Sequence, residues 1–191
     1  GNKNAILKMM AAALLTKETV VIQSVPGISD VLVMIEILRD LGATVVYNEK
    51  TKVLEITAAA IKNTVIKPDL ARKLRASNTL LGPLLGRVGL VTSTLPGGDK
   101  IGPREMNAHF DGLAQLGAHV SFVSPDTFSL KGRLRGQSVF LYEPSVTATE
   151  NVLLASVLAS GVTTIDNAAS EPHVRALAEM LISMGAHIKG A

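Results

Sequence analysis

A glycine-rich stretch at residues 95–109, LPGGDKIGPREMNAH, holds the side chains best suited to chemistry. An acid, Asp99, stands there beside the cations Lys100 and Arg104, with little apolar content. The planar arginine side chain matches phosphate oxygens two at a time, lysine acts as a point charge, and glycine lets backbone N–H groups approach an anion. The stretch therefore indicates a functional loop suited to an anionic ligand, with a neutral surface insertion as the alternative.

The composition narrows the class of partner. The chain has 191 residues, of which 47% are hydrophobic and only 3% aromatic, and a net charge of +3. It shows neither the dense basic stripe nor the aromatic platforms typical of nucleic-acid binding. It has no cysteine and no His/Asp/Glu cluster with metal-ligand spacing. No apolar run reaches the roughly 18 residues that span a bilayer. We expect a small anionic ligand, no metal, no nucleic acid, no membrane and a cytoplasmic location.

Three similar segments, spaced by 74 and 73 residues, divide the chain. Each opens with asparagine and an apolar helix, continues into a β-branched run, and ends in a second helix that glycine and alanine close. The openings lie at residues 4–7, 78–81 and 151–154, and the closures at 41–43, 116–118 and 184–186. We therefore predict one α/β domain built from units of about 1–67, 68–142 and 143–191.

The elements of each unit follow from their patterns. The first helices are apolar nearly all round and should be buried, whereas the second are amphipathic, with Ser170 as the N-cap of the last. A strand should begin at Thr44, His119 and His187, and the first two should continue as hairpins. The chain starts inside a helical pattern and stops just after a strand begins, so we expect a fragment of a longer reading frame.

The second unit is longer than the other two. The segment between the end of the middle strand and the Gly-Ala pair that ends the second helix is 21 residues long in this unit. It is 16 residues long in the first unit and 17 in the third. The extra residues surround Asp99. A loop lengthened in one repeat of three is more often functional than structural.

More specific residues carry a family resemblance. They are Gly1-Asn2-Lys3-Asn4-Ala5, Arg75-Ala76-Ser77 with Leu81-Gly82-Pro83-Leu84, Leu95-Pro96-Gly97-Gly98, Ile101-Gly102, Arg104 and His109, and Ser145-Val146 with Ala148-Thr149. Together they resemble the UDP-N-acetylglucosamine 1-carboxyvinyltransferases, the enolpyruvyl transferases that start peptidoglycan precursor synthesis. The resemblance runs the whole length of the chain. It implies an inside-out α/β barrel of three units with pseudo-threefold symmetry, and a second domain of the enzyme that is absent from this chain.

The resemblance also implies a reaction and a set of site residues. The family moves the enolpyruvyl group of phosphoenolpyruvate to the 3-hydroxyl of UDP-N-acetylglucosamine and releases phosphate, without a cofactor. The loop residue that protonates the methylene carbon corresponds to Asp99. The substrate-binding positions correspond to Lys3, Asn4, Arg75, Arg104, Glu105, Met106, Asn107, Ala108, His109, Ser145 and Val146.

Two positions depart from the family pattern, and other interpretations stay open. The common pattern has cysteine at Asp99 and lysine where Glu143 stands, which puts one diphosphate contact in doubt. Taken alone, Asp99 could be a solvated loop residue, Arg75 an ordinary helix cation and Ser145 a helix N-cap. The alternatives for the whole chain are a non-catalytic UDP-sugar-binding or partner-binding module, and the sister enzyme that acts on shikimate 3-phosphate.

Overall fold

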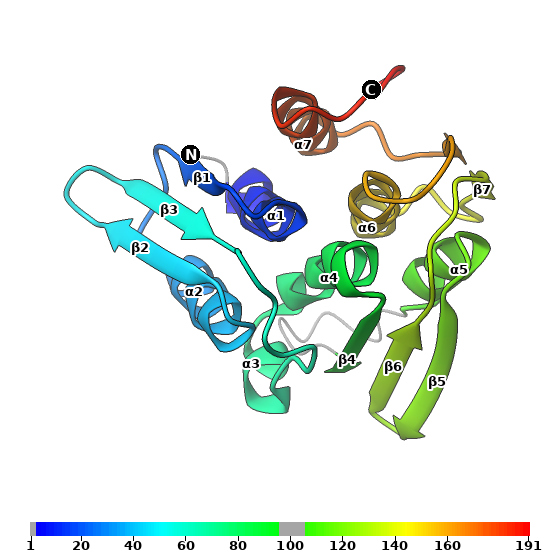
Figure 1. Ribbon diagram of the computed structural model, residues 1–191, viewed down its shortest axis with the longest axis horizontal. Helices are drawn as coiled ribbons and strands as arrows, with labels where there is room; N and C mark the ends of the chain where they lie inside the picture. Colours follow the sequence, from blue (N-terminus) through cyan, green and yellow to red (C-terminus); the bar gives the residue numbers. More distant parts are fainter. Residues whose placement is uncertain (1–2, 96–105) are drawn as a thin grey trace.

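Three central helices form the core of the protein (Figure 1). The structure is a computed structural model that describes residues 3–95 and 106–191. The central helices are α1 (Lys3–Ala12), continued by the 3-10 turn η1 (Ala13–Leu15), α4 (Leu81–Val88), preceded by the 3-10 turn η2 (Arg75–Leu80), and α6 (Val146–Ser156). Leu14, Leu84 and Leu154 are fully buried. The predicted burial of the first helix of each unit is therefore confirmed.

Sheets and outer helices surround this core. The first unit's antiparallel sheet has the order β1–β3–β2, and the second repeats it as β4–β6–β5, so both predicted hairpins are confirmed. The strands are β1 (Thr19–Ile22), β2 (Thr44–Asn48), β3 (Val53–Thr57), β4 (Leu90–Thr94), β5 (His119–Ser124) and β6 (Thr127–Lys131). The outer helices are α2 (Ser29–Asp40), α5 (Asn107–Gln115) and α7 (Pro172–Ser183), with a short α3 (Pro68–Lys73) between the first two units.

Parallel strand pairs connect successive units. The segment after β3 meets β4 through a parallel bridge between Val65 and Thr92. In the same way β7 (Ser138–Phe140) pairs in parallel with β8 (Thr164–Asp166) of the third unit. The first unit thus meets the sheet of the second through one bridge, and the second contributes a strand to the sheet of the third, around helices that lie inside (Figure 1). The predicted α/β barrel of three units is confirmed.

Two local predictions were wrong. The helix α7 has Glu171, not Ser170, as its N-cap, because Pro172 occupies the first helical position and restricts the residue before it to extended backbone. Residues 187–191 form no strand. In the first two units, β2 and β5 pair with the strand that follows them, whereas no strand of the described residues pairs with 187–191.

The central helices run in the same direction. Gly82 of α4 lies against Asn151 of α6, and one turn later Gly86 lies against Ala155. Likewise α1 packs against η2 while η1, which follows it, packs against α4. The N-terminal ends of the central helices therefore lie at one end of the barrel, and that end carries most of the predicted substrate residues.

Candidate functional site

A buried asparagine of α6 connects that helix to η2, α4 and α5. The amide of Asn151 donates from Nδ2 to the backbone oxygen of Asn78 and to Nδ1 of His109, both at 2.8 Å, and its Oδ1 accepts from the backbone nitrogen of Gly82 at 2.9 Å. Asn151 is fully buried and His109 is 2% exposed. One side chain thus joins the second and third units at the end of the barrel that carries Arg75 and Ser145.

These contacts assign the tautomer of His109, and its burial determines its charge. The backbone N–H of Gly82 can only donate, so Oδ1 of Asn151 must face it and Nδ2 must face the histidine. Nδ1 of His109 therefore accepts, and Nε2 donates to Oγ1 of Thr147 at 3.0 Å. Burial, and then the positive charge of Arg75, lower the pKa of His109 from 6.5 to about 4. The imidazole is neutral at pH 7 and joins α5 to the first turn of α6.

The first turn of α6 is capped by hydrogen bonds from nearby side chains. Ser145 is the N-cap, and its hydroxyl accepts from the backbone nitrogen of Ala148 at 3.4 Å. Thr149 donates to the backbone oxygen of Ser145 at 2.8 Å and accepts from the backbone nitrogen of Ala169 at 3.0 Å. The capping role that the sequence allowed for Ser145 is confirmed.

The predicted site residues fall into three groups. Arg75 begins η2 and is half-buried, Val146 begins α6, and Asn107 begins α5 with an exposed side chain. Met106 and Ala108 are buried together with His109, and Sδ of Met106 accepts from Nδ2 of Asn78 at 2.9 Å. The structure brings these residues together around the α5 and α6 starts. Asp99, Arg104 and Glu105 lie outside the described residues.

The start of α1 supplies the remaining predicted residues. Lys3 is the first residue of α1, and its side chain lies outside the described part. Asn4 follows with an exposed side chain. Because α1 runs alongside η2, this turn lies at the same end of the barrel as Arg75.

Sequence reasoning missed a buried charged cluster one helical turn below these starts. Lys8 of α1 lies 3.1 Å from Oε2 of Glu150 of α6, and their side chains are 6% and 0% exposed. His173 of α7 lies 3.8 Å from Oε1 of Glu150. The signal was present, since Lys8 and Glu150 are charged residues inside helices that were predicted to be buried.

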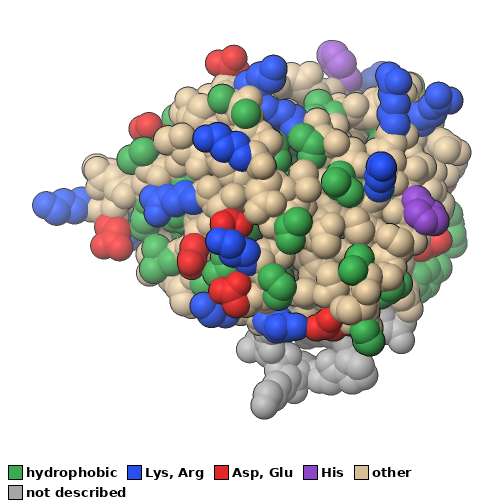
Figure 2. Space-filling view, turned by 60° about the horizontal axis from the view of Figure 1, so that its bottom comes forward, with side chains coloured by type: hydrophobic (Ala, Val, Ile, Leu, Met, Phe, Trp, Pro, Cys, Tyr) green, Lys and Arg blue, Asp and Glu red, His purple; other side chains and the backbone are tan. Residues whose placement is uncertain are grey.

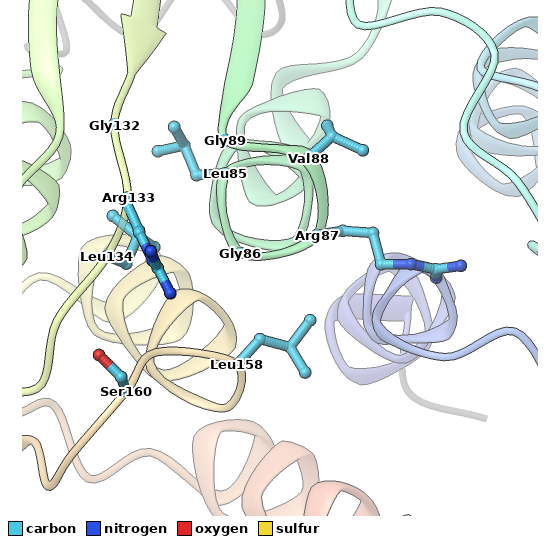
Figure 3. A pocket seen from close by; sticks show the side chains of 10 residues that line it. All are labelled: Leu85, Gly86, Arg87, Val88, Gly89, Gly132, Arg133, Leu134, Leu158 and Ser160. Atoms are coloured by element: carbon cyan, nitrogen blue, oxygen red, sulfur yellow. The ribbon is translucent and has the colours of Figure 1, made fainter.

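A separate hollow of about 400 Å³ lies at the opposite ends of α4 and α6 (Figure 3). Arg133 and Ser160 line it together with three glycines, Gly86, Gly89 and Gly132. Arg87 points away from it in Figure 3 and donates to the backbone oxygens of Leu14 and Thr16 at 2.6 and 2.8 Å. The hollow is remote from the helix starts and includes none of the predicted site residues.

The surface carries few further signals. On the face shown in Figure 2, Lys and Arg side chains are interspersed with Asp and Glu and form no continuous stripe. Within residues 3–95 and 106–191, no three His, Asp or Glu side chains are grouped so that they could hold a metal ion. None of the described helices is long and apolar enough to cross a membrane.

The fold of this chain matches that of solved enolpyruvyl transferases. The enolpyruvyl transferase NikO from Streptomyces tendae superposes with a TM-score of 0.88 at 22% identity, covering 99% of this chain and 44% of that one. EPSP synthase from Acinetobacter baumannii superposes with a TM-score of 0.77 at 19% identity, covering 100% of this chain and 44% of that one. The chain has the fold of an enolpyruvyl transferase domain.

Sequence comparison gives the family. The model of the EPSP synthase (3-phosphoshikimate 1-carboxyvinyltransferase) family matches residues 1–191, and the chain belongs to that family. Among curated relatives, the UDP-N-acetylglucosamine 1-carboxyvinyltransferase of Borreliella burgdorferi is 47% identical over 190 residues, which are 100% of this chain and 44% of that protein. The protein of the same name from Treponema pallidum is 48% identical with the same coverage, 100% and 44%. The chain thus spans less than half the length of these relatives.

Proposed function

We propose that this chain is part of a longer cytoplasmic enzyme that transfers the enolpyruvyl group of phosphoenolpyruvate to the 3-hydroxyl of UDP-N-acetylglucosamine. The reaction releases phosphate and is the first committed step of peptidoglycan precursor synthesis, hence of cell-wall biogenesis. One observation carries this proposal: relatives from several bacterial groups, 44–48% identical along the whole chain, bear the name of this activity.

The geometry of the helix starts supports the substrate class. Phosphoenolpyruvate and a UDP-sugar bring several negative charges together, and cations must balance them once water is excluded. Arg75 lies at the start of η2, close enough to His109 for its charge to lower the pKa of that residue. Lys3 and Arg104 are proposed to add further positive charge from α1 and from the loop. We assign phosphate binding to these three cations.

The start of α6 is suited to the diphosphate of the sugar nucleotide. Backbone N–H groups in the first turn of a helix attract anions, and Ser145 and Val146 begin this one. Asn4 and residues 105–109 are proposed to complete the sugar-nucleotide side of the site. Glu143, which stands where the family has lysine, removes one positive charge from this turn.

Asp99 is the proposed general acid. Addition of the sugar hydroxyl to phosphoenolpyruvate requires a proton at the methylene carbon. A free aspartate has a pKa of about 3.9, so only about one in a thousand is protonated at pH 7. Exclusion of water beside an anionic substrate raises the pKa of a carboxyl group, and the charges of Lys100 and Arg104 oppose that rise. We expect Asp99→Asn to abolish turnover while UDP-N-acetylglucosamine still binds.

Phosphate release from phosphoenolpyruvate by the full-length protein tests the proposed function. The acceptors are UDP-N-acetylglucosamine and shikimate 3-phosphate, because the name of the matching family model describes a reaction of the latter. We expect release with the UDP-sugar alone. Release with shikimate 3-phosphate alone identifies the sister reaction, and release with neither favours a binding module.

A matched pair of variants, Asp99→Asn and Asp111→Asn, tests the proposed role of Asp99 as general acid. Asp111→Asn removes an exposed carboxylate on α5 and should leave turnover unchanged. Near-normal turnover of Asp99→Asn would remove the acid role from Asp99 without touching the assignment of the reaction.

A further inference from the structure

The contact between α1 and α6 differs from the other contacts of the core. Figure 1 shows these two helices apart, with α4 on one side and α7 on the other. Lys8 reaches from α1 and Glu150 from α6, and the ammonium nitrogen lies 3.1 Å from Oε2 of the carboxylate. The side chains are 6% and 0% exposed, so the space between the two helices is occupied by a buried ion pair.

This pair is costly to bury. Apart from Lys8, no residue in the described ranges donates a hydrogen bond to the carboxylate of Glu150, so Lys8 is its main compensation. Apolar residues of similar volume are often as stabilising as a buried ion pair, or more so. Stability alone therefore gives little reason for charged residues at these two positions.

The charges around the pair come from three helices. His173, at the start of α7, is 3.8 Å from Oε1 of Glu150, and Glu171 precedes it. Burial, and then the charge of Lys8, lower the pKa of His173, while Glu171 opposes the change. Burial raises the pKa of Glu150, the charge of Lys8 opposes that rise, and Glu171 adds to it. His173 is neutral at pH 7, so Lys8 is the cation that faces Glu150.

The position of the pair relates it to the candidate site. Lys8 follows Asn4 by one helical turn and Glu150 follows Val146 by one turn, a distance of roughly 6 Å along each axis. The two helices run in the same direction, so the pair connects them just below the two starts that carry Lys3, Asn4, Ser145 and Val146. A charge-assisted hydrogen bond between an ammonium and a carboxylate is short, and it therefore holds the two helices at one spacing.

We propose that Lys8 and Glu150 are positioning residues, which set the spacing between the start of α1 and the start of α6 so that both can contact one sugar nucleotide. This inference rests on the proposed function. The pair does not touch substrate; it acts through the two helix starts. Its removal should therefore impair substrate binding even when the stability of the fold is preserved.

The test compares single and double variants of the full-length protein. Lys8→Met and Glu150→Met each leave one buried charge unpaired and should lower the melting temperature by about 5 °C or more. The double variant replaces the pair with apolar side chains and should regain the wild-type melting temperature. Its KM for UDP-N-acetylglucosamine should nevertheless stay raised by about tenfold or more, because small displacements of positioning groups have large effects.

The exposed ion pair of α7 provides the control. Arg175 and Glu179 are 3.2 Å apart with side chains 70% and 64% exposed, and their double replacement by methionine should change neither KM nor melting temperature. A wild-type KM in the stable Lys8→Met/Glu150→Met variant would overturn the positioning role. So would a double variant that stays as unstable as the singles, since the pair would then be needed for folding alone. Absence of phosphate release by the wild-type protein would instead refute the proposed function, and this inference with it.

Discussion

The two contacts that α6 makes with the other central helices are built on opposite principles. Toward α4, the helices approach closely through Gly82, and the neutral side chain of Asn151 satisfies every polar group it meets. Toward α1, the helices stand apart and the charges of Lys8 and Glu150 fill the space. The first contact resembles an ordinary protein core. The second holds a buried ion pair that a core does not need for stability. We therefore infer that the α4–α6 contact stabilises the fold, whereas the α1–α6 contact positions the helix starts of the candidate site.

The largest expected loss of stability comes from removing one member of the Lys8–Glu150 ion pair. Lys8→Met leaves the Glu150 carboxylate buried without its partner, and loss of one member of a buried pair costs about 4 kcal/mol. Urea unfolding at pH 7 measures the change, with the exposed Lys17→Met as the control. A loss below about 1 kcal/mol would show that Glu150 is not charged in the folded protein.

The neutral contact should instead be sensitive to acid. The pKa of His109 falls from 6.5 to about 4 on folding, so the unfolded chain binds more protons between these values. Stability is therefore lost as the pH falls through this window, by about 3 kcal/mol in full. Urea unfolding between pH 7 and 4 should show a steeper loss for the wild type than for His109→Gln. Parallel curves for the two proteins would contradict the neutral, buried histidine.

A single methyl group should break the close approach of α4 and α6. A Cβ atom at Gly82 would collide with the backbone oxygen of Asn151, whereas one at Gly86 would meet the backbone oxygen of Ala155 at an ordinary 3.4 Å. Gly82→Ala should destabilise by about 2 kcal/mol through overpacking. Gly86→Ala, one turn later on the same helix, should be neutral or stabilise by up to about 1 kcal/mol through helix propensity. Equal effects in thermal unfolding would count against the close contact.

The smallest effect concerns the cap of α6. Ser145→Ala removes the acceptor of the Ala148 backbone N–H and should cost about 1 kcal/mol. Ser170→Ala is the matched control, because the sequence suggests a cap there but Glu171 holds that position. If the two variants unfold at the same denaturant concentration, the capping bond contributes nothing measurable.

The repeat pattern made much of the fold predictable. The first two units repeat the order of apolar helix, strand, amphipathic helix and hairpin, and the third repeats it without the hairpin. The closing glycines at 42, 117 and 185 all have positive φ, as a helix C-terminus requires. The cap at Glu171 was missed because the restriction that Pro172 places on its neighbour outweighs the capping preference of serine. The strand predicted from His187 is absent, because residues 187–191 pair with no neighbouring strand of the described residues.

The candidate site was only partly predictable. Motif residues pointed to Arg75, His109 and Ser145, which the structure brings to one end of the barrel, and their roles toward substrate stay predictions. Sequence spacing could not show that Asn151 bonds to His109, since 42 residues separate them. Nor could it pair Lys8 with Glu150, because long-range contacts between helices depend on packing that no local pattern encodes.

The most direct test is a crystal structure of the full-length protein with UDP-N-acetylglucosamine bound. We predict that the ligand contacts the first turn of α1, through Lys3 or Asn4, and the first turn of α6, through Ser145 or Val146, in the same molecule. The Lys8–Glu150 pair should lie one turn below it, intact and out of contact. A ligand bound at only one of the two starts, or in the hollow beside Arg133, would contradict this account.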